Sequence, residues 1–146
     1  MAKNILGLID FSSVSEDIVN KAAELSKVYG AKCWLVHVAR PDPEFIGYDV
    51  GPKYIRDARA EHLLDEHHKL DEYKSRLISQ GINAEALLVQ GEIMDTIQPE
   101  VDKLEIDLIV VGSHGRSMLY ELMVGSVCEN LLKNSKVPLF IVPAKK

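Results

Sequence analysis

Short apolar runs alternate along this chain with longer segments in which apolar residues recur at helical spacing. A run of about four to eight such residues, bounded by polar or turn residues, is typical of a buried strand in a parallel sheet. Five segments fit this pattern and are predicted to be strands: Ile5–Ile9, Lys32–Ala39, Ala84–Val89, Asp107–Val111 and Val137–Val142.

Four segments between these runs have the spacing of helices. The first is predicted to begin near Ser13, because Ser13 to Glu16 has the form of a capping box, and to end at Gly30 as a left-handed cap. Its expected buried face consists of Ile18, Val19, Ala22, Ala23 and Leu25. The other helices are predicted over Asp57–Gln80, after Glu92 to about Leu104, and from Ser126 to Asn134.

Two prolines bear on these predictions. Pro99 lies inside the third helical segment, where it removes a backbone donor, so it predicts either a kink or the true start of that helix. Pro138 lies inside the last predicted strand. Since proline cannot donate to a ladder, this position predicts an edge strand rather than a central one.

The alternation of strand and helix predicts an α/β layered fold with a mostly parallel sheet. The length of 146 residues fits one domain, 1–146, and the chain shows no internal repeat or low-complexity tract. Open sheets of this kind bind ligands beyond the carboxyl ends of the strands, where the strand order reverses. If the order is 3-2-1-4-5, Asp10 and Gly112 end neighbouring strands at that point.

The composition and net charge indicate which kinds of ligand the chain can bind. The chain is 47% apolar and 27% charged, as expected of a globular protein, and its formal net charge is -5. A protein that binds nucleic acid through its phosphates normally has a basic face, so nucleic-acid binding is not expected. A small anionic ligand is compatible with this charge, because backbone N–H groups can hold it locally.

Cys33 and Cys128 lack the spacing of a metal site, and we interpret both as small core residues in preference to a redox pair. Asp10 interrupts the first apolar run, so the amino terminus does not resemble a signal peptide. No apolar run approaches the roughly 20 residues that a membrane helix needs. A cytoplasmic protein without membrane insertion is therefore expected.

The segment Arg40–Arg56 is rich in proline and glycine, and a loop of this length in a compact domain is expected to be functional or mobile. Its aromatic residues, Phe45, Tyr48 and Tyr54, are predicted to pin it to the body of the protein.

The long helical segment that follows carries several potential metal ligands: His62, Asp65, Glu66, His67 and His68. His67 and His68 are adjacent, so they point in different directions on a helix. His62 and Glu66 are one turn apart, without an evident third ligand. A solvated helical face is therefore favoured over a metal site, and metal ligands stay unassigned.

The segment Asp107–Ser126 combines a strand, a loop punctuated by glycines and a helix start. Gly112, Gly115 and Gly125 allow backbone N–H groups to approach an anion closely, and Ser126 marks a helix amino terminus with unpaired donors. The spacing alone leaves two interpretations open, a phosphate-binding loop or a strand end followed by a turn and an ordinary N-cap. It is neither a Walker loop nor a dinucleotide-binding glycine fingerprint.

Four further residues can complete a nucleotide site around this loop. Asp10 can accept a hydrogen bond from an adenine amino group or a ribose hydroxyl, and backbone groups of Val38 can meet a base edge. Arg116 supplies a charge suited to phosphate, and His114 is a weaker candidate for the same role.

The spacing G-x2-G-x9-G-S, formed by Gly112, Gly115, Gly125 and Ser126, resembles the ATP-binding signature of the universal stress protein family. The surrounding sequence is similar as well: VVGSHGR around the first glycines, GSVCENLLKNSKVPLFIV from the third, LIDFS near the start and LVHV in the second strand. The resemblance covers essentially the whole chain.

The resemblance implies a Rossmann-like fold of the adenine-nucleotide alpha hydrolase type, with a five-stranded parallel sheet in the order 3-2-1-4-5 between helices. It also implies a homodimer formed by antiparallel pairing of the last strands, here Val137–Val142. Members with the glycine motif are similar in binding ATP, and Mg2+ is expected to bind through the phosphates.

The residues that the resemblance places around the adenine nucleotide are Leu8, Ile9, Asp10, Val38, Val111, Gly112, Gly115, Gly125, Ser126 and Val127, to which the charges of His114 and Arg116 are added. Members often carry Pro or Val and Thr or Ser just before the aspartate. Because this chain has Leu8 and Ile9 there, contacts at these two positions are expected through the backbone.

The main functional expectation is a dimeric regulatory protein of the stress response that binds ATP. No catalytic residue is assigned, since hydrolysis needs a positioned water and stabilisation of the transferred phosphoryl group. Slow ATP hydrolysis is one alternative, whereas an efficient enzyme is not expected, because the motifs of related nucleotidyl transferases and pyrophosphatases do not occur. The other alternative is an interaction module with an unknown protein partner and no physiological nucleotide.

Overall fold

The computed structural model describes residues 2–39, 53–113 and 126–143. The predictions for most of the Arg40–Arg56 segment and for most of the glycine loop lie outside the described residues. Five strands are present: β1 (Asn4–Ile9), β2 (Lys32–Ala39), β3 (Ala84–Gln90), β4 (Leu108–Gly112) and β5 (Leu139–Val142). The helices between them are α1 (Ser15–Tyr29), α2 (Lys53–Ser79), α3 (Ile93–Lys103) and α4 (Ser126–Asn134).

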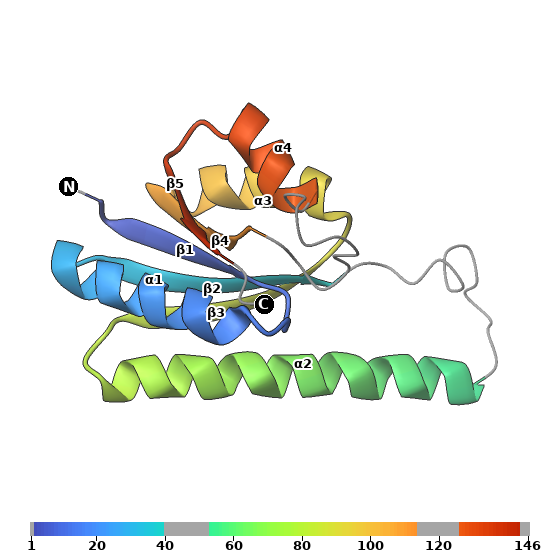
Figure 1. Ribbon diagram of the computed structural model, residues 1–146. Helices are drawn as coiled ribbons and strands as arrows, with labels where there is room; N and C mark the ends of the chain where they lie inside the picture. Colours follow the sequence, from blue (N-terminus) through green and yellow to red (C-terminus); the bar gives the residue numbers. More distant parts are fainter. Residues whose placement is uncertain (1, 40–52, 114–125, 144–146) are drawn as a thin grey trace.

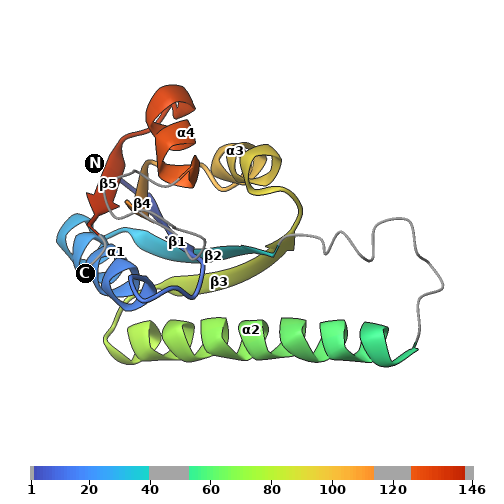
Figure 2. The same ribbon diagram turned by 45° about the vertical axis from the view of Figure 1, so that its right-hand side comes forward.

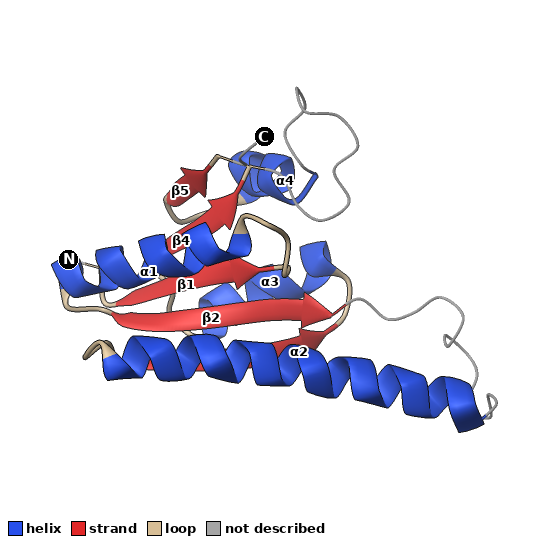
Figure 3. Cartoon of the chain, turned by 60° about the horizontal axis from the view of Figure 1, so that its bottom comes forward, coloured by secondary structure: helices blue, strands red, loops and turns tan. Residues whose placement is uncertain are grey.

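The strands form one parallel sheet in the order β3-β2-β1-β4-β5. This confirms the predicted order 3-2-1-4-5 and the predicted edge position of the last strand. α3 and α4 cover one face of the sheet, and α1 and α2 cover the other (Figures 1 and 2). Figure 3 looks onto the side of α1 and α2.

The sheet separates two apolar cores, because successive residues of a strand point to opposite faces. On β2, Cys33 and Leu35 face α1 and α2, whereas Val36 and Val38 face α3 and α4. Large members of the first core include Ile5, Ile9, Ile18, Leu35, Leu70, Leu77 and Val110, and those of the second include Leu6, Val36, Ile97, Val101, Ile109 and Leu131.

The two cysteines belong to different cores, Cys33 to the core beneath α1 and α2, and Cys128 to the core on the opposite face. Both are buried free thiols, which confirms their interpretation as core residues and excludes a disulfide between them. Burial raises the pKa of the Cys33 thiol to about 11. Cys33 is therefore an unreactive thiol at neutral pH.

The start of α1 differs from the predicted capping box. The helix begins at Ser15, with Val14 in the N-cap position and without a side-chain cap hydrogen bond. The Ser15 hydroxyl donates instead to the Asp10 carboxylate, so this side chain fixes the turn after β1 rather than the helix end. The other end is as predicted, because Gly30 takes a left-handed conformation with φ of 64°. Leu25, expected on the buried face, is only partly buried.

Other boundaries also differ from the predictions. α2 begins at Lys53, earlier than the predicted Asp57, so the last residues of the predicted loop are helical. β5 begins at Leu139, after Pro138, whose carbonyl accepts the N–H of Ile109. Pro99 lies inside α3 and does not mark its start. Within the described ranges, no helix combines the length and apolar character needed to span a bilayer.

Candidate functional site

β1 and β4 separate at their carboxyl ends. Their ladder ends where Gly7 pairs with Val110, although β1 continues to Ile9 and β4 to Gly112. Over these last residues β1 stays paired with β2, and β4 stays paired with β5. The sheet therefore opens at the point where the strand order reverses, which is where open α/β sheets bind ligands.

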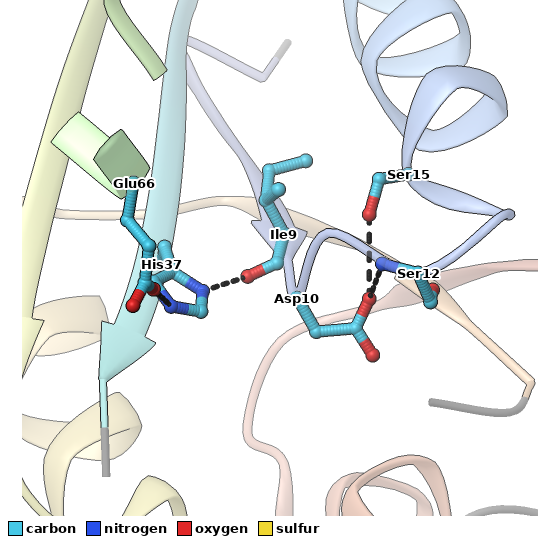
Figure 4. A network of polar contacts seen from close by, with 6 residues as sticks. All are labelled: Ile9, Asp10, Ser12, Ser15, His37 and Glu66. Carbon is cyan, nitrogen blue, oxygen red and sulfur yellow. Dashed lines mark hydrogen bonds and ion pairs between the residues drawn. The ribbon is translucent and has the colours of Figure 1, made fainter. Parts of the chain in front are cut away.

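Asp10 lies beside this opening, directly after β1. Its Oδ1 accepts hydrogen bonds from the Ser12 N–H at 2.9 Å and from the Ser15 hydroxyl at 3.3 Å (Figure 4). Phe11, the next residue, has φ of 62°, a left-handed conformation that few non-glycine residues adopt. The two hydrogen bonds hold the carboxylate in one orientation and support this unusual turn.

Three of the predicted site residues share one face of the sheet. Leu8, Val38 and Val111 are buried in the core beneath α3 and α4, and Val127 in the first turn of α4 packs against the same core. The side chain of Ile9 belongs to the opposite core and is 1% exposed. Any contact that Ile9 makes with a ligand must therefore come from its backbone, as the sequence indicated.

Gly112 ends β4 on the other side of the opening. It is buried and lies in register with Val142 of β5, and the Ser113 N–H donates to the Val142 carbonyl at 2.9 Å. The hydrogen bonds of β4 at this level are thus directed toward β5. The side of β4 that faces β1 has no ladder partner beyond Val110 among the described strands.

The other predicted site residues are located only in part. His114, Gly115, Arg116 and Gly125 lie outside the described residues. Ser126 is helical and is the first described residue of α4. The structure thus brings together the predicted site residues of β1, β2 and β4. It also shows that α4, the helix after the glycine loop, packs on the same side of the sheet.

A buried histidine and carboxylate lie beside the site, and the sequence analysis missed their contact. His37 Nε2 contacts the Glu66 carboxylate, and the two residues are 6% and 4% exposed. The prediction of a solvated face is wrong for Glu66. A signal was present, since Glu66 precedes Leu70 by one turn and Leu77 by about three turns, which places it on the buried stripe of α2.

Three other residues of the predicted polar face agree with the structure, whereas the side chain of His62 lies outside the described ones. Asp65, His67 and His68 are exposed, and His67 forms an exposed pair with Asp71, with 3.3 Å between Nε2 and Oδ2. Among the residues that the structure describes, no group of three or more His, Cys, Asp or Glu side chains is arranged to hold a metal ion.

A separate groove of about 290 Å³ lies between α3 and α4. Its walls are mainly apolar, and its lining includes Ile93, Ile97, Gln98, Val127, Asn130 and Leu131. This groove lies on the helical side of the second core. The strand ends, which carry the candidate chemistry, are the better candidate for the functional site.

An open parallel sheet that separates at the reversal of strand order defines an α/β protein with the adenine-nucleotide alpha hydrolase-like fold. The chain belongs to the universal stress protein family, whose sequence profile matches residues 1–143. It is 29% identical to the universal stress protein YxiE of Bacillus subtilis over 147 residues, which cover 97% of this chain and 99% of that protein.

Solved structures of related proteins have the same fold. The structure of MJ0577, a universal stress protein of Methanocaldococcus jannaschii, matches with a TM-score of 0.83 and 25% identity, over 99% of this chain and 97% of that one. An Arabidopsis thaliana member of the family with AMP bound matches with a TM-score of 0.70 and 19% identity, over 98% of this chain and 92% of that one.

Proposed function

We propose that this chain is a regulatory universal stress protein that binds an adenine nucleotide, ATP, in the opening between the ends of β1 and β4. The separation of these strands beyond Gly7 and Val110 is the observation that carries the proposal. In this arrangement the adenosine lies on the side of Asp10 and Val38. The triphosphate extends toward Gly112 and the amino terminus of α4, whose unpaired N–H groups favour an anion.

The glycine spacing from Gly112 to Ser126 supports the phosphate half of the proposal. Glycines at Gly115 and Gly125 leave room for backbone donors to reach the phosphate oxygens. His114 and Arg116 add charge, and Mg2+ joins the complex mainly through the phosphates, as it commonly does with nucleotides. We assign no catalytic residue, so the proposed role is nucleotide sensing in the cytoplasm rather than efficient hydrolysis.

Similar proteins support the choice of an adenine nucleotide. The structurally similar Arabidopsis thaliana protein has AMP bound, and another universal stress protein of similar fold is in complex with cAMP, with a TM-score of 0.69 and 22% identity. Both ligands contain adenosine. We therefore expect the part of the proposed site next to Asp10 to bind the adenosine that these ligands share. The phosphates of ATP then extend toward the glycine loop.

We further propose that two copies of the chain pair through β5. This strand lies at the edge of the sheet, and Phe140 and Ile141 expose 36% and 37% of their surface there. An edge strand offers unpaired N–H and C=O groups to a second strand. Antiparallel pairing of two β5 strands satisfies these groups and covers both exposed side chains.

Nucleotide release and thermal unfolding test the proposed ligand. The purified chain is denatured, and its supernatant is examined by absorbance and mass spectrometry for bound adenine nucleotide. In parallel, ATP with Mg2+ is added to the native protein at about 100 times Kd, where binding adds roughly 2.7 kcal/mol to the free energy of unfolding. If no nucleotide is released and ATP leaves the melting temperature unchanged, the chain is an interaction module and the proposal is wrong.

Substitutions in the loop test where the phosphates bind. Gly115→Leu and Gly125→Leu are expected to abolish ATP binding, because a side chain there blocks the approach of the backbone to the phosphates. Ser75→Leu is the matched control, since it places the same side chain at an exposed position of α2. Unchanged affinity in both loop variants would contradict the phosphate site.

A further inference from the structure

The residue that follows Asp10 has a backbone conformation that a phenylalanine rarely adopts. Phe11 comes directly after Asp10 and has φ of 62°. In this left-handed region the Cβ atom of an ordinary residue crowds its own backbone, whereas glycine adopts the region readily. A phenylalanine here must therefore be held by contacts that outweigh the strain.

The aromatic ring of Phe11 makes such contacts with two other elements. It packs against the imidazole of His37 from β2, with 4.6 Å between the ring centroids and an interplanar angle of 51°, a tilted arrangement that aromatic pairs favour. The ammonium group of Lys69 from α2 lies over the ring, with 5.4 Å from Nζ to the centroid. The side chain also packs against the core beneath α1 and α2. Phe11 thus attaches the turn after β1 to β2 and α2.

His37 is a firmly held partner for this ring. It is only 6% exposed, and its Nδ1 lies 2.7 Å from the carbonyl oxygen of Ile9, the residue before Asp10 (Figure 4). Since a carbonyl oxygen can only accept, Nδ1 carries the hydrogen and donates it. Nε2, on the opposite side of the imidazole, contacts the Glu66 carboxylate. The imidazole therefore has its own supports and contacts the chain on both sides of Asp10.

The contacts of Asp10 and those of Phe11 hold different parts of the turn. Oδ1 of Asp10 accepts hydrogen bonds from Ser12 and Ser15, which fix the carboxylate relative to the start of α1. These bonds lie within one short stretch of chain, so they do not by themselves fix that stretch relative to the sheet. The ring of Phe11 does, because its partners belong to β2 and α2.

We propose that Phe11 is a positioning residue of the nucleotide site, and that its ring holds the turn after β1 in the place where Asp10 receives the adenosine. This inference rests on the proposed function. A turn that is ordered before the ligand arrives does not have to be ordered on binding, so the affinity rises without any contact between Phe11 and the nucleotide. The ring thus supplies an order that a glycine at this position would lack.

Phe11→Gly separates the ring from the backbone conformation. Glycine accommodates φ of 62° without strain, so the variant can still form the turn and loses only the contacts of the ring. We expect its ATP affinity, measured by calorimetric titration, to fall by about tenfold, as the loss of one aromatic contact would produce. Glu105→Gly is the matched control. Glu105 is the other non-glycine residue with positive φ in the described chain, at 53°, and it precedes the amino end of β4, away from the opening. This control should bind ATP as wild type does.

A double-mutant cycle with Asp10→Asn shows whether Phe11 acts through Asp10. The asparagine oxygen can still accept from Ser12 and Ser15, so the turn keeps its own hydrogen bonds. Phe11→Gly should lower the ATP affinity in the wild-type background and change it little in the Asp10→Asn background. A residue that only stabilises the fold would give the same loss in both. Phe11→Leu, which keeps an apolar side chain without aromatic faces, takes the place of Phe11→Gly in the cycle if the glycine variant does not fold.

The outcomes distinguish this inference from the proposed function. A wild type that binds no ATP overturns both. If wild type binds ATP and Phe11→Gly binds it at least as tightly, the positioning role alone is overturned, because the backbone conformation then suffices without the ring. Equal losses in the two backgrounds also overturn it. An Asp10→Asn protein with unchanged ATP affinity does so as well, since Phe11 would then have no recognition group to position.

Discussion

Gly7 of β1 packs closely against Ala22 of α1. A Cβ atom at Gly7 would come within 3.3 Å of the Ala22 Cβ and 3.4 Å of Leu35 Cδ2. The absence of a side chain at Gly7 therefore lets α1 sit directly on the sheet. Because Gly7 is also the last residue of β1 paired with β4, this close contact lies at the base of the opening.

Gly7→Val is expected to destabilise the chain by about 1–3 kcal/mol, because the added methyl groups overpack the contact between β1 and α1. Urea denaturation measures the change in the free energy of unfolding. Gly7→Ala is the control, and its cost should be smaller, since a single methyl meets only tight contacts and removes the flexibility of a glycine from the unfolded chain. A Gly7→Val variant as stable as wild type would show that α1 can move away from β1 without cost.

Asp107 is expected to make stability depend on pH. Its Oδ2 accepts the backbone N–H groups of Lys3 and Asn4 at 2.7 and 3.0 Å, and these bonds lower the pKa of the carboxyl below its ordinary value. A lowered native pKa contributes stability that is present above the ordinary pKa and is lost as the pH falls through the native one. Since the carboxylate is exposed, the contribution should not exceed about 1 kcal/mol.

Asp107→Asn tests this contribution by chemical denaturation at neutral and acidic pH. The variant should be less stable than wild type at neutral pH, and the difference should disappear in acid. Asp102→Asn controls for the loss of one negative charge, because that exposed carboxylate accepts from the Gln98 side chain at 3.3 Å rather than from backbone N–H groups of another strand. A difference that persists unchanged into acid would assign the effect to shape rather than charge.

The fold could be predicted from sequence because its signals are local and repeated. Each strand appears as an apolar run, and Gly30 ends α1 as its position indicated. The capping-box prediction failed, since α1 begins at Ser15 and this hydroxyl donates to Asp10, five residues earlier, outside the spacing of a capping box. The position of Pro138 predicted the edge location of β5 correctly. The strand itself begins at Leu139, because proline has no N–H to donate to a neighbouring strand.

The candidate site could be predicted only to the level of its backbone. Asp10 and Gly112 end neighbouring strands, as the strand order required. The separation of the strands beyond Val110 depends on the twist and packing of the whole sheet, so it cannot be predicted from a local sequence pattern. The contact between His37 and Glu66 joins residues far apart in sequence, and the many charged residues of α2 made the buried position of Glu66 hard to recognise.

The dimer proposed through β5 predicts that a charge on this strand produces monomers. Ile141→Glu places a carboxylate on the exposed edge strand, where burial against a second copy would remove it from water at high cost. Light scattering of the purified variant should then give the mass of one chain. Val28→Glu is the control, because Val28 is an exposed apolar residue of α1, with 73% of its surface accessible. Equal masses for Ile141→Glu and wild type would place the interface elsewhere.

The two hydrogen bonds that Asp10 accepts through Oδ1 make it possible to separate its structural role from base recognition. In Asp10→Asn the amide oxygen can still accept from Ser12 and Ser15, while the other position changes from an acceptor to an N–H donor. If the carboxylate accepts from the adenine amino group, the donor opposes ATP and suits the oxygen of guanine. We therefore expect the preference for ATP over GTP to fall by about tenfold.

Titration of wild type, Asp10→Asn and Ser15→Ala with both nucleotides checks this expectation. Ser15→Ala removes one support of the turn without touching a ligand group, so it should weaken ATP and GTP binding by similar factors. An equal loss for both nucleotides in Asp10→Asn would assign the carboxylate to the ribose hydroxyl, which ATP and GTP share. Unchanged affinity for both would remove Asp10 from the nucleotide site and leave it as a residue that only holds the turn between β1 and α1.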